Sequence, residues 1–324
     1  MNKRTTAAFL IFCVALLILD GRCAADSAAE ALSLCGRVLI PSLFPLFVVC
    51  GMLVPQLKGM GFPLLSRLLG MPEGSGGLYL LGCAGGFPVG AACIAQTVEE
   101  GSLSREDGSR MLGLCSFCGP AFIFGVLPRL LPMRLVIALF VLQLETGLLL
   151  AAFWPGGSSG ALKPSGQSIS LPEGVSRAVS SMLSVCAWVT LAAVAAGFLC
   201  RWLYPLLPDG IALLLTGLLE LTNGIFALPP DDPSLTFLLC AVFVCFGGVS
   251  VLLQIGGLAC RAGLPMGPCI AQKSLHALLG TVTAAGYLRF GSGILFLTPL
   301  LLFVKMVLEI PRRMVYNDPR KEGI

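Results

Sequence analysis

Charged side chains are scarce in this sequence of 324 residues. Only 12% of the residues are Asp, Glu, Lys or Arg, whereas 56% are hydrophobic and the mean hydropathy is +0.91. Soluble domains carry about 25% charged residues, so this chain has too few charges to cover a surface that faces water. The composition excludes an ordinary soluble domain. It predicts an all-α polytopic membrane protein whose main partner is the lipid bilayer.

Histidine is almost missing, and the common enzyme motifs are missing altogether. His276 is the single histidine, which excludes a multi-histidine metal site within one chain, and no Walker loop, His-Glu-x-x-His or Ser-His-Asp set is present. The net charge of +4 is too small and too scattered for nucleic-acid binding. We therefore predict no enzyme, cofactor, metal or nucleic-acid partner. One enzyme alternative stays open, an intramembrane hydrolase in which Cys115 or Cys118 reaches His276.

Cysteine is abundant, with 14 residues, and nearly all of them lie in apolar runs. There they are expected to act as small packing residues, because disulfides need an oxidising compartment. Only Cys115 and Cys118 form a Cys-x-x-Cys motif. Since no second pair exists to complete a metal site, we interpret them as small residues one turn apart in a membrane helix.

Apolar segments long enough to cross a bilayer, about 20 residues each, occur along the whole chain. We predict about ten transmembrane or re-entrant helices, at 5–19, 38–54, 77–97, 111–127, 134–154, 178–200, 211–228, 235–258, 269–288 and 291–309. The run at 5–19 follows Lys3 and Arg4 like a signal peptide, but Asp20 and Arg22 interrupt the cleavage site, so we expect an uncleaved span. Residues 26–41 and 173–184 are amphipathic and are predicted to lie at the interface.

The positive-inside rule gives an orientation for these spans. With both termini in the cytoplasm, the basic side receives Lys3, Arg4, Lys58, Arg67, Arg129, Arg134, Arg201, Arg261, Arg312, Arg313, Arg320 and Lys321. The opposite side receives the loop at 99–110, the linker at 155–174 and the acidic pair Asp231 and Asp232. This pattern agrees with about ten crossings.

Glycines suggest an internal repeat. Gly85, Gly86 and Gly101 recur as Gly247, Gly248 and Gly263 at one offset of 162 residues, and an odd number of spans between them would reverse the orientation. We predict two inverted halves. The first membrane half is 1–154, the linker is 155–174, the second half is 175–311 and a cytoplasmic tail is 312–324.

Two kinds of residue are candidates for a binding site at membrane depth. Glycine and proline break helices, which leaves backbone groups that protein, water or a ligand must satisfy. Polar residues inside spans are costly and usually face a cavity or one another. We predict a substrate site from Gly85, Gly86, Pro88, Gly90, Ser116, Gly119, Pro120, Glu220, Thr222, Asn223, Gly247, Gly248, Ser250, Gln254, Lys273 and His276. The alternative is close helix packing at kinks that bind nothing.

Within this set, Lys273 and His276 are expected on one helical face. There the lysine would hold a carboxylate, pair with Glu220 or extend to the interface. Glu145 also lies within a predicted span, without neighbours in sequence that support a role.

Four strips of sequence resemble the sporulation integral membrane protein family of endospore formers (the YlbJ type). They are PSLFPLFVVCGML at 41–53, GGFPVGAA at 85–92 with the stretch at 100–125, LLELTNGI at 218–225, and GGVSVLLQ at 247–254 with AQKSLHAL at 271–278. The family belongs to the nucleoside-recognition or gate-domain group. Relative to the family pattern, the first strip is less polar, with Gly85, Phe87 and Ala92, and the stretch at 116–118 is Ser-Phe-Cys.

The resemblance implies a transporter-like protein that acts in sporulation. It implies a small anionic solute, such as the dicarboxylate dipicolinic acid, moving across the outer forespore membrane through a site in the middle of the membrane. Two alternatives stay open, a carrier of the same fold for nucleosides and a scaffold for spore-envelope assembly that transports nothing. The sequence leaves room for a homo-oligomer.

Overall fold

The computed structural model describes residues 2–57, 62–156, 160–163, 169–229 and 231–305. Over these residues the chain is helical and has no strand, apart from one isolated bridge between Glu73 and Ala161. Five helical stretches in this part of the chain are long and apolar enough to cross a membrane: Gly21–Leu57, Met133–Phe153, Leu171–Leu206, Pro233–Arg261 and Gly267–Lys305. The chain is a multi-pass α-helical membrane protein.

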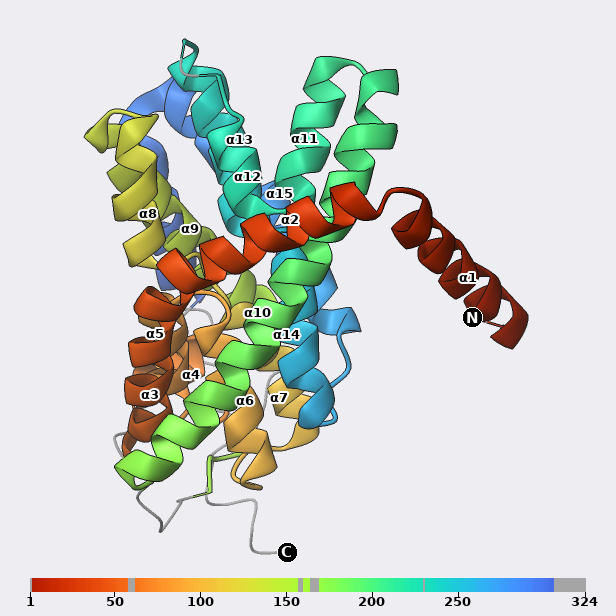
Figure 1. The fold of residues 1–324 in the computed structure, drawn as a ribbon. Coiled ribbons are helices and arrows are strands. Elements are labelled where there is room, and N and C mark those ends of the chain that lie inside the picture. The colour runs from red at the N-terminus through yellow and green to blue at the C-terminus, as the bar shows by residue number, and fades with distance from the viewer. Residues whose placement is uncertain (1, 58–61, 157–159, 164–168, 230, 306–324) are drawn as a thin grey trace, which may run out of the picture.

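Two long helices cross each other at the front of the molecule in Figure 1. The first consists of α2 (Gly21–Leu34), a π-helical turn (Cys35–Leu39) and α3 (Ile40–Leu57), and the second is α10 (Leu171–Trp202). The π turn ends two residues before Pro41, which has no N–H to give to the helical ladder. An ion pair of 2.8 Å between Arg201 and Asp20 joins the end of α10 to the start of α2.

The two segments that are predicted to lie at the interface, 26–41 and 173–184, form parts of these two long helical stretches. Both segments continue without interruption into long helices, and they pack at different places: α2 lies against the later part of α10, and the start of α10 lies against α3. Gly197 of α10, for example, comes so close to Ser27 of α2 that a Cβ there would overlap the serine hydroxyl. The helix crossing, which a local pattern does not show, supplies the burial.

Two of the predicted spans fold back on themselves and form helical hairpins. Segment 77–97 becomes α5 (Gly76–Gly85) and α6 (Val89–Glu99), and segment 211–228 becomes α11 (Asp209–Leu219) and α12 (Leu221–Phe226). In a straight helix, Gly82 and Gly90 would be about 12 Å apart. Here a Cβ on Gly90 would lie 2.8 Å from the Gly82 Cα, and one on Gly224 would overlap Gly217.

A broken helix follows each hairpin. Segment 111–127 consists of α7 (Arg105–Leu114), five residues that are not helical, and α8 (Pro120–Val126). Segment 235–258 consists of α13 (Pro233–Phe246) and α14 (Gly248–Arg261), which are separated at Gly247 with φ 88°. A long helix comes next in both cases, α9 (Met133–Phe153) and α15 (Gly267–Phe290). The same order of elements thus occurs twice.

The two hairpins enter the molecule from opposite ends. In Figure 1, α5 and α6 occupy the lower part with α3, α7 and the linker, whereas α11 lies in the upper part with α8 and α13. Arg110 of α7 donates to the carbonyls of Gly70, Trp154 and Pro155, so these loops share the lower end. We call this lower end, at which α9 enters the linker, the linker end.

This arrangement corrects the orientation predicted from basic residues. Because segment 77–97 turns back instead of crossing, the loop at 99–110 stays on the same side as Arg67 and Arg261. Arg129, Arg134 and Arg201 are at the opposite end, together with Asp231 and Asp232. Lys58 and the basic residues of the tail at 312–324 lie outside the described residues.

The 162-residue register is also wrong. It matches Gly85 and Gly86, at the turn of a hairpin, with Gly247 and Gly248, at the break of a helix that continues. The helices that follow, α6 and α14, run in the same direction, and shortly after their ends come Gly101 and Gly263, both with φ near 68°. The two hairpins correspond instead at a shift of about 133 residues, which takes the turn at 87 to the turn at 220. The long helices agree with this shift, because α9 begins at Met133 and α15 begins 134 residues later, at Gly267.

The remaining helices lie at the periphery. Helix α1 (Lys3–Leu19) has no buried residue, and the short α4 (Pro63–Leu68) precedes the first hairpin. After Gly291, with φ 71°, the chain turns back through a 3-10 segment (Gly291–Phe296) toward the linker end. There Lys305 donates to the carbonyls of Leu68 and Ala152.

Candidate solute-binding cavity

A cavity of about 230 Å³ lies where the turns of the two hairpins meet. The first hairpin contributes Gly85, Gly86 and Phe87, and the second contributes Glu220, Leu221 and Thr222. The other walls are formed by the broken helix, the two crossing helices and α14, through Cys118, Gly119, Ala121, Phe122, Val126, Leu34, Val38, Leu39, Ser42, Leu43, Leu46, Val189, Val251 and Gln254. We call it the tip cavity. Its lining is mostly apolar with a few polar groups, as in small-molecule sites generally.

Glycines allow the first hairpin to pack directly on the non-helical segment 115–119. A Cβ at either Gly82 or Gly90 would overlap the carbonyl oxygen of Cys115. At the turn itself, a Cβ on Gly86 would meet the backbone of Gly119, and Gly86 has a φ of 72° that L side chains rarely adopt. Backbone therefore faces backbone at this wall of the cavity, and any larger residue would push the wall apart.

Glu220 forms the turn of the second hairpin. Its carboxylate accepts a hydrogen bond of 2.7 Å from the backbone N–H of Asn223 and so caps the first turn of α12. The turn packs on the break of the next helix, because a Cβ on Gly248 would lie 3.2 Å from the nitrogen of Leu221. Each hairpin turn thus rests on the break in the helix that follows it. Glu220 is also the one charged side chain that lines the tip cavity.

Lys273 and His276 of α15 lie behind the cavity wall and hold the non-helical segment. The Lys273 ammonium is fully buried and donates 2.9 Å to the carbonyl of Ser116. It also lies 3.3 Å from His276 Nδ1, so the two residues share one helical face as the sequence predicts. His276 Nε2 lies 2.9 Å from the carbonyl of Gln143, which can only accept, so Nε2 carries the proton and Nδ1 accepts from the lysine.

Two glutamines complete this network. The side-chain amide of Gln143 donates 2.8 Å to the carbonyl of Cys118, and that of Gln272 donates 2.7 Å to the carbonyl of Arg110. The Cys118 carbonyl lies outside the helices and lacks the partner that an unbroken α7–α8 helix would give it, whereas the Gln272 amide binds a carbonyl within α7, close to the break. At membrane depth no water is at hand to replace those partners, and each unsatisfied group would cost several kcal/mol. The buried amides and the ammonium of Lys273 stabilise the break.

Phe87 separates Lys273 from the tip cavity. The Lys273 nitrogen lies 4.7 Å from the centre of the Phe87 ring, in a cation-π contact, and the ring itself lines the cavity. A Cβ on Gly247 would lie 2.9 Å from the Phe87 ring, so the break between α13 and α14 provides the space for it. A solute in the tip cavity would touch the ring and not the ammonium.

The structure brings six of the sixteen predicted site residues to the tip cavity: Gly85, Gly86, Gly119, Glu220, Thr222 and Gln254. The others support the walls. Pro88 and Pro120 precede or open helices, Gly90, Gly247 and Gly248 allow close packing, and Asn223 donates to Glu220. Ser116 and Ser250 are buried, and Ser250 accepts from Gln254 at 3.3 Å.

Three expectations for individual residues need correction. Lys273 neither pairs with Glu220 nor extends to the interface, because its ammonium is bound to Ser116. Cys115 and Cys118 are buried thiols in the non-helical segment, not neighbours on a helix. The ring nitrogens of His276 lie against Lys273, Gln143 and Thr146, not against a thiol.

Sequence reasoning missed three residues that matter here, Phe87, Gln143 and Gln272. Both glutamines are polar residues inside predicted spans, and that feature alone does not identify a site. Glu145 has the same feature but does not line the tip cavity. Phe87 lies inside the first glycine-rich strip, but an aromatic residue is ordinary in a membrane protein, so the sequence does not mark it as part of a site. Its position is set by Gly247, 160 residues away in the sequence.

Comparison with known proteins gives one result in agreement with this architecture. The chain is 27% identical over 134 residues to the sporulation integral membrane protein YlbJ of Bacillus subtilis (strain 168). The match covers 39% of this chain and spans 32% of that relative's length. No family model matches the sequence, and no solved structure matches it. The chain is thus a multi-pass membrane protein with partial similarity to a sporulation membrane protein.

Proposed function

We propose that this protein is a carrier or facilitator that moves a small solute through the tip cavity during sporulation. The observation that carries the proposal is the meeting of two hairpin turns at two broken helices around one cavity. Open backbone at membrane depth is costly and is tolerated where it lines a cavity or is buried in protein. Transporters commonly place such breaks at their substrate site. The partial similarity to a sporulation membrane protein supports the cellular role.

The proposal includes an inverted repeat. The order of hairpin, broken helix and long helix occurs in α5–α9 and again in α11–α15, and the hairpins enter from opposite ends. Two halves related in this way present equivalent walls to both sides of a membrane, which suits alternating access to one central site. The long crossing helices, α2–α3 and α10, would be the first element of each half.

For the solute, we propose a small planar dicarboxylate such as dipicolinate, in line with the family resemblance. The Lys273 cation behind Phe87 supports an anion, since its field reaches the cavity through a buried, low-dielectric layer. Glu220 acts in the opposite direction because it places a carboxylate on the cavity wall. That carboxylate favours the second candidate, an uncharged nucleoside-type solute that hydrogen-bonds to Glu220 and Gln254.

Reconstitution of the purified protein in liposomes tests these candidates together. Uptake of radiolabelled dipicolinate and of radiolabelled uridine is measured side by side. Liposomes without protein give the background, and an excess of unlabelled solute shows whether uptake by the folded protein saturates. Saturable dipicolinate flux supports the first candidate, and saturable uridine flux supports the second. If demonstrably folded protein moves neither solute, the carrier proposal fails and a scaffold for spore-envelope assembly takes its place.

A further inference from the structure

A second cavity, of about 280 Å³, lies at the linker end of the molecule. It is lined by Phe47, Gly51, Val89, Ala92, Cys93, Ala95, Gln96, Glu99, Glu100, Ile169, Gly174, Arg177, Ala178, Ser180, Ser181, Leu258 and Arg261. We call it the linker-end cavity. It shares no lining residue with the tip cavity, yet four elements contribute to both cavities: α3, the first hairpin, α10 and α14.

Each of these four elements passes first one cavity and then the other. On α14, Val251 and Gln254 line the tip cavity, and Leu258 and Arg261 line the linker-end cavity. On α3, Leu46 lines the tip cavity and the next residue, Phe47, lines the linker-end cavity. The first hairpin contributes its turn to the tip cavity and the body of α6 to the other, and α10 contributes Val189 and then Ser181 and its neighbours. The two cavities therefore lie in line along one bundle.

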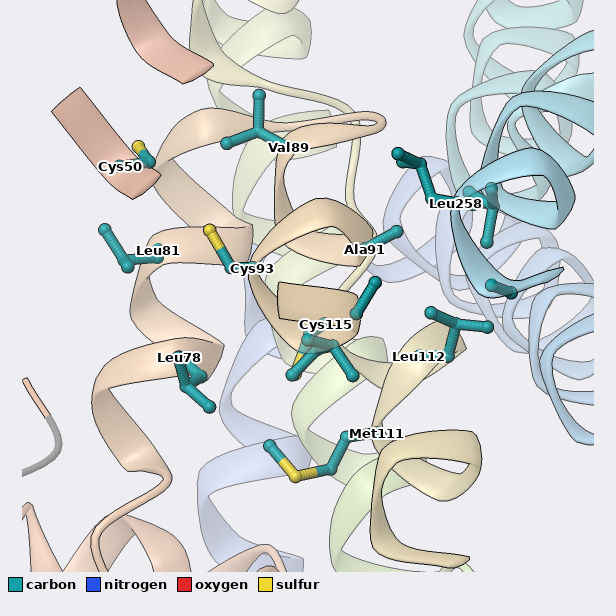
Figure 2. Close-up of a cluster of buried hydrophobic side chains, with 14 of the residues drawn as sticks. Cys50, Leu78, Leu81, Val89, Ala91, Cys93, Met111, Leu112, Cys115 and Leu258 are labelled. Atoms are coloured by element: carbon teal, nitrogen blue, oxygen red, sulfur yellow. The ribbon is translucent and has the colours of Figure 1, made fainter. Parts of the chain in front are cut away.

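A thin apolar layer separates them. From Gln254 to Leu258 is one helical turn, a rise of about 6 Å. At this level the side chains are apolar and buried: Phe47 on α3, Val89 on α6, Val185 on α10, and Ile255 and Leu258 on α14. Figure 2 shows how α6 fits between its neighbours, with Cys93 on the side of Cys50 and Ala91 on the side of Leu258. We call this group the apolar layer.

The linker-end cavity has the chemistry of a water-filled mouth. Four charged side chains line it, whereas one lines the tip cavity. Arg177 forms an ion pair of 2.8 Å with Glu100, and its side chain remains 42% exposed. Arg261 donates 2.9 Å to the hydroxyl of Ser180. Charged residues in membrane proteins usually face water or one another, so a polar solute that enters from the linker end would meet these side chains first.

We propose that the linker-end cavity is the second vestibule of the permeation path, and that the apolar layer is the closed gate between it and the tip cavity. This inference rests on the carrier function proposed above. The solute would be a polar one that fits both cavities, and opening would require the helices that carry the apolar layer to move apart. The structure is then a state in which the tip cavity is closed toward the linker end.

Cysteine accessibility tests the proposal without any transported solute. Ser42→Cys lies in the tip cavity and Ser181→Cys in the linker-end cavity. Both are made in the full chain with the two exposed native cysteines, Cys200 and Cys260, changed to serine. A membrane-impermeant methanethiosulfonate reagent is applied to intact cells or to inverted vesicles, and the labelled peptide is identified by mass spectrometry.

The expected result is that Ser42→Cys is labelled from one face of the membrane only and Ser181→Cys from the other face only. Adding Leu258→Ala to Ser42→Cys removes part of the apolar layer and should allow labelling from both faces. Leu139→Ala is the matched control, because Leu139 is equally buried but belongs to the other core of the protein. With this control, labelling of Ser42→Cys should stay one-sided.

Labelling of both cysteines from the same face, or of neither, would overturn the proposal, as would equal results for Leu258→Ala and Leu139→Ala. The outcome does not depend on the liposome assay. If dipicolinate and uridine are not transported, the carrier function proposed above fails, and one-sided labelling of the two cysteines would then show only that the two cavities open to opposite faces. If transport is observed but both cavities open to one face, the carrier function stands without this gate.

Discussion

The ammonium of Lys273 donates a hydrogen bond of 2.9 Å to the main-chain carbonyl of Ser116, 157 residues earlier in the chain. This contact joins α15 to the non-helical segment between α7 and α8. It makes Lys273 a positioning residue for the wall of the tip cavity, because the Phe87 ring lies between the ammonium and the cavity. Four predictions follow from the cavity and its supports.

Lys273→Met should loosen the segment 115–119 without unfolding the protein. The variant removes the donor from the Ser116 carbonyl but also removes a buried charge, and these two effects on global stability oppose each other. We expect amide hydrogen exchange in 115–119 to rise about tenfold, the equivalent of about 1.4 kcal/mol, with Tm changed little. Lys163→Met, at an exposed lysine, is the control. Unchanged exchange together with lost transport would show that Lys273 contacts the solute instead.

Gly90→Ala should destabilise the protein strongly. The new Cβ would overlap the carbonyl oxygen of Cys115, and neither the hairpin nor the buried backbone opposite can move freely. Overpacking of this kind costs about 1–3 kcal/mol or more, which thermal unfolding in detergent would detect. Gly125→Ala in α8 is the control, since a Cβ there meets nothing within 4 Å. A Tm for Gly90→Ala equal to that of the control would contradict the close packing of the first hairpin.

Phe87→Ala should increase the preference for anionic solutes. Without the ring, the tip cavity extends to the Lys273 ammonium, 4.7 Å beyond the present ring centre. The ratio of dipicolinate to uridine binding should rise about fivefold, which corresponds to about 1 kcal/mol. Phe122→Ala is the matched control, because Phe122 also lines the cavity but makes no contact with Lys273. The same ratio in both variants would mean that the cation does not act on the solute through Phe87.

Glu220→Gln should also favour anions, for a different reason. The amide oxygen can still accept from the backbone N–H of Asn223, so α12 keeps its cap while the cavity loses a negative charge. We expect the Kd for dipicolinate to fall severalfold and that for uridine to change less. Asp232→Asn tests the capping effect alone, because Asp232 caps α13 with bonds of 3.0 Å to Ser234 and Leu235 away from the cavity. An equal effect of both variants would remove Glu220 from the site.

Three positions at which helices break are predicted from the sequence, whereas the break at Glu220, between α11 and α12, is not. Gly85–Pro88, Gly119–Pro120 and Gly247–Gly248 are all breaks in the structure, because proline cannot donate to the helical ladder and glycine accepts positive φ. What a break does was not predictable. At Gly86 the chain reverses, at 115–119 it runs on in extended form, and at Gly247 it only kinks. The choice among these outcomes depends on which neighbour satisfies the open backbone groups.

Composition and local pattern by themselves determined that this chain lies in a membrane, that it is helical, and where three of its helices break. These properties depend on the hydropathy and backbone preferences of residues that are adjacent in the sequence. Only the tertiary structure decided that 77–97 and 211–228 turn back, that Lys273 holds a distant carbonyl, and that Phe87 stands between it and the cavity. Those decisions depend on contacts between separate segments of the chain, such as Gly82 with Cys115, Ser116 with Lys273, and Phe87 with Gly247. A local pattern of one sequence carries no information about such pairs.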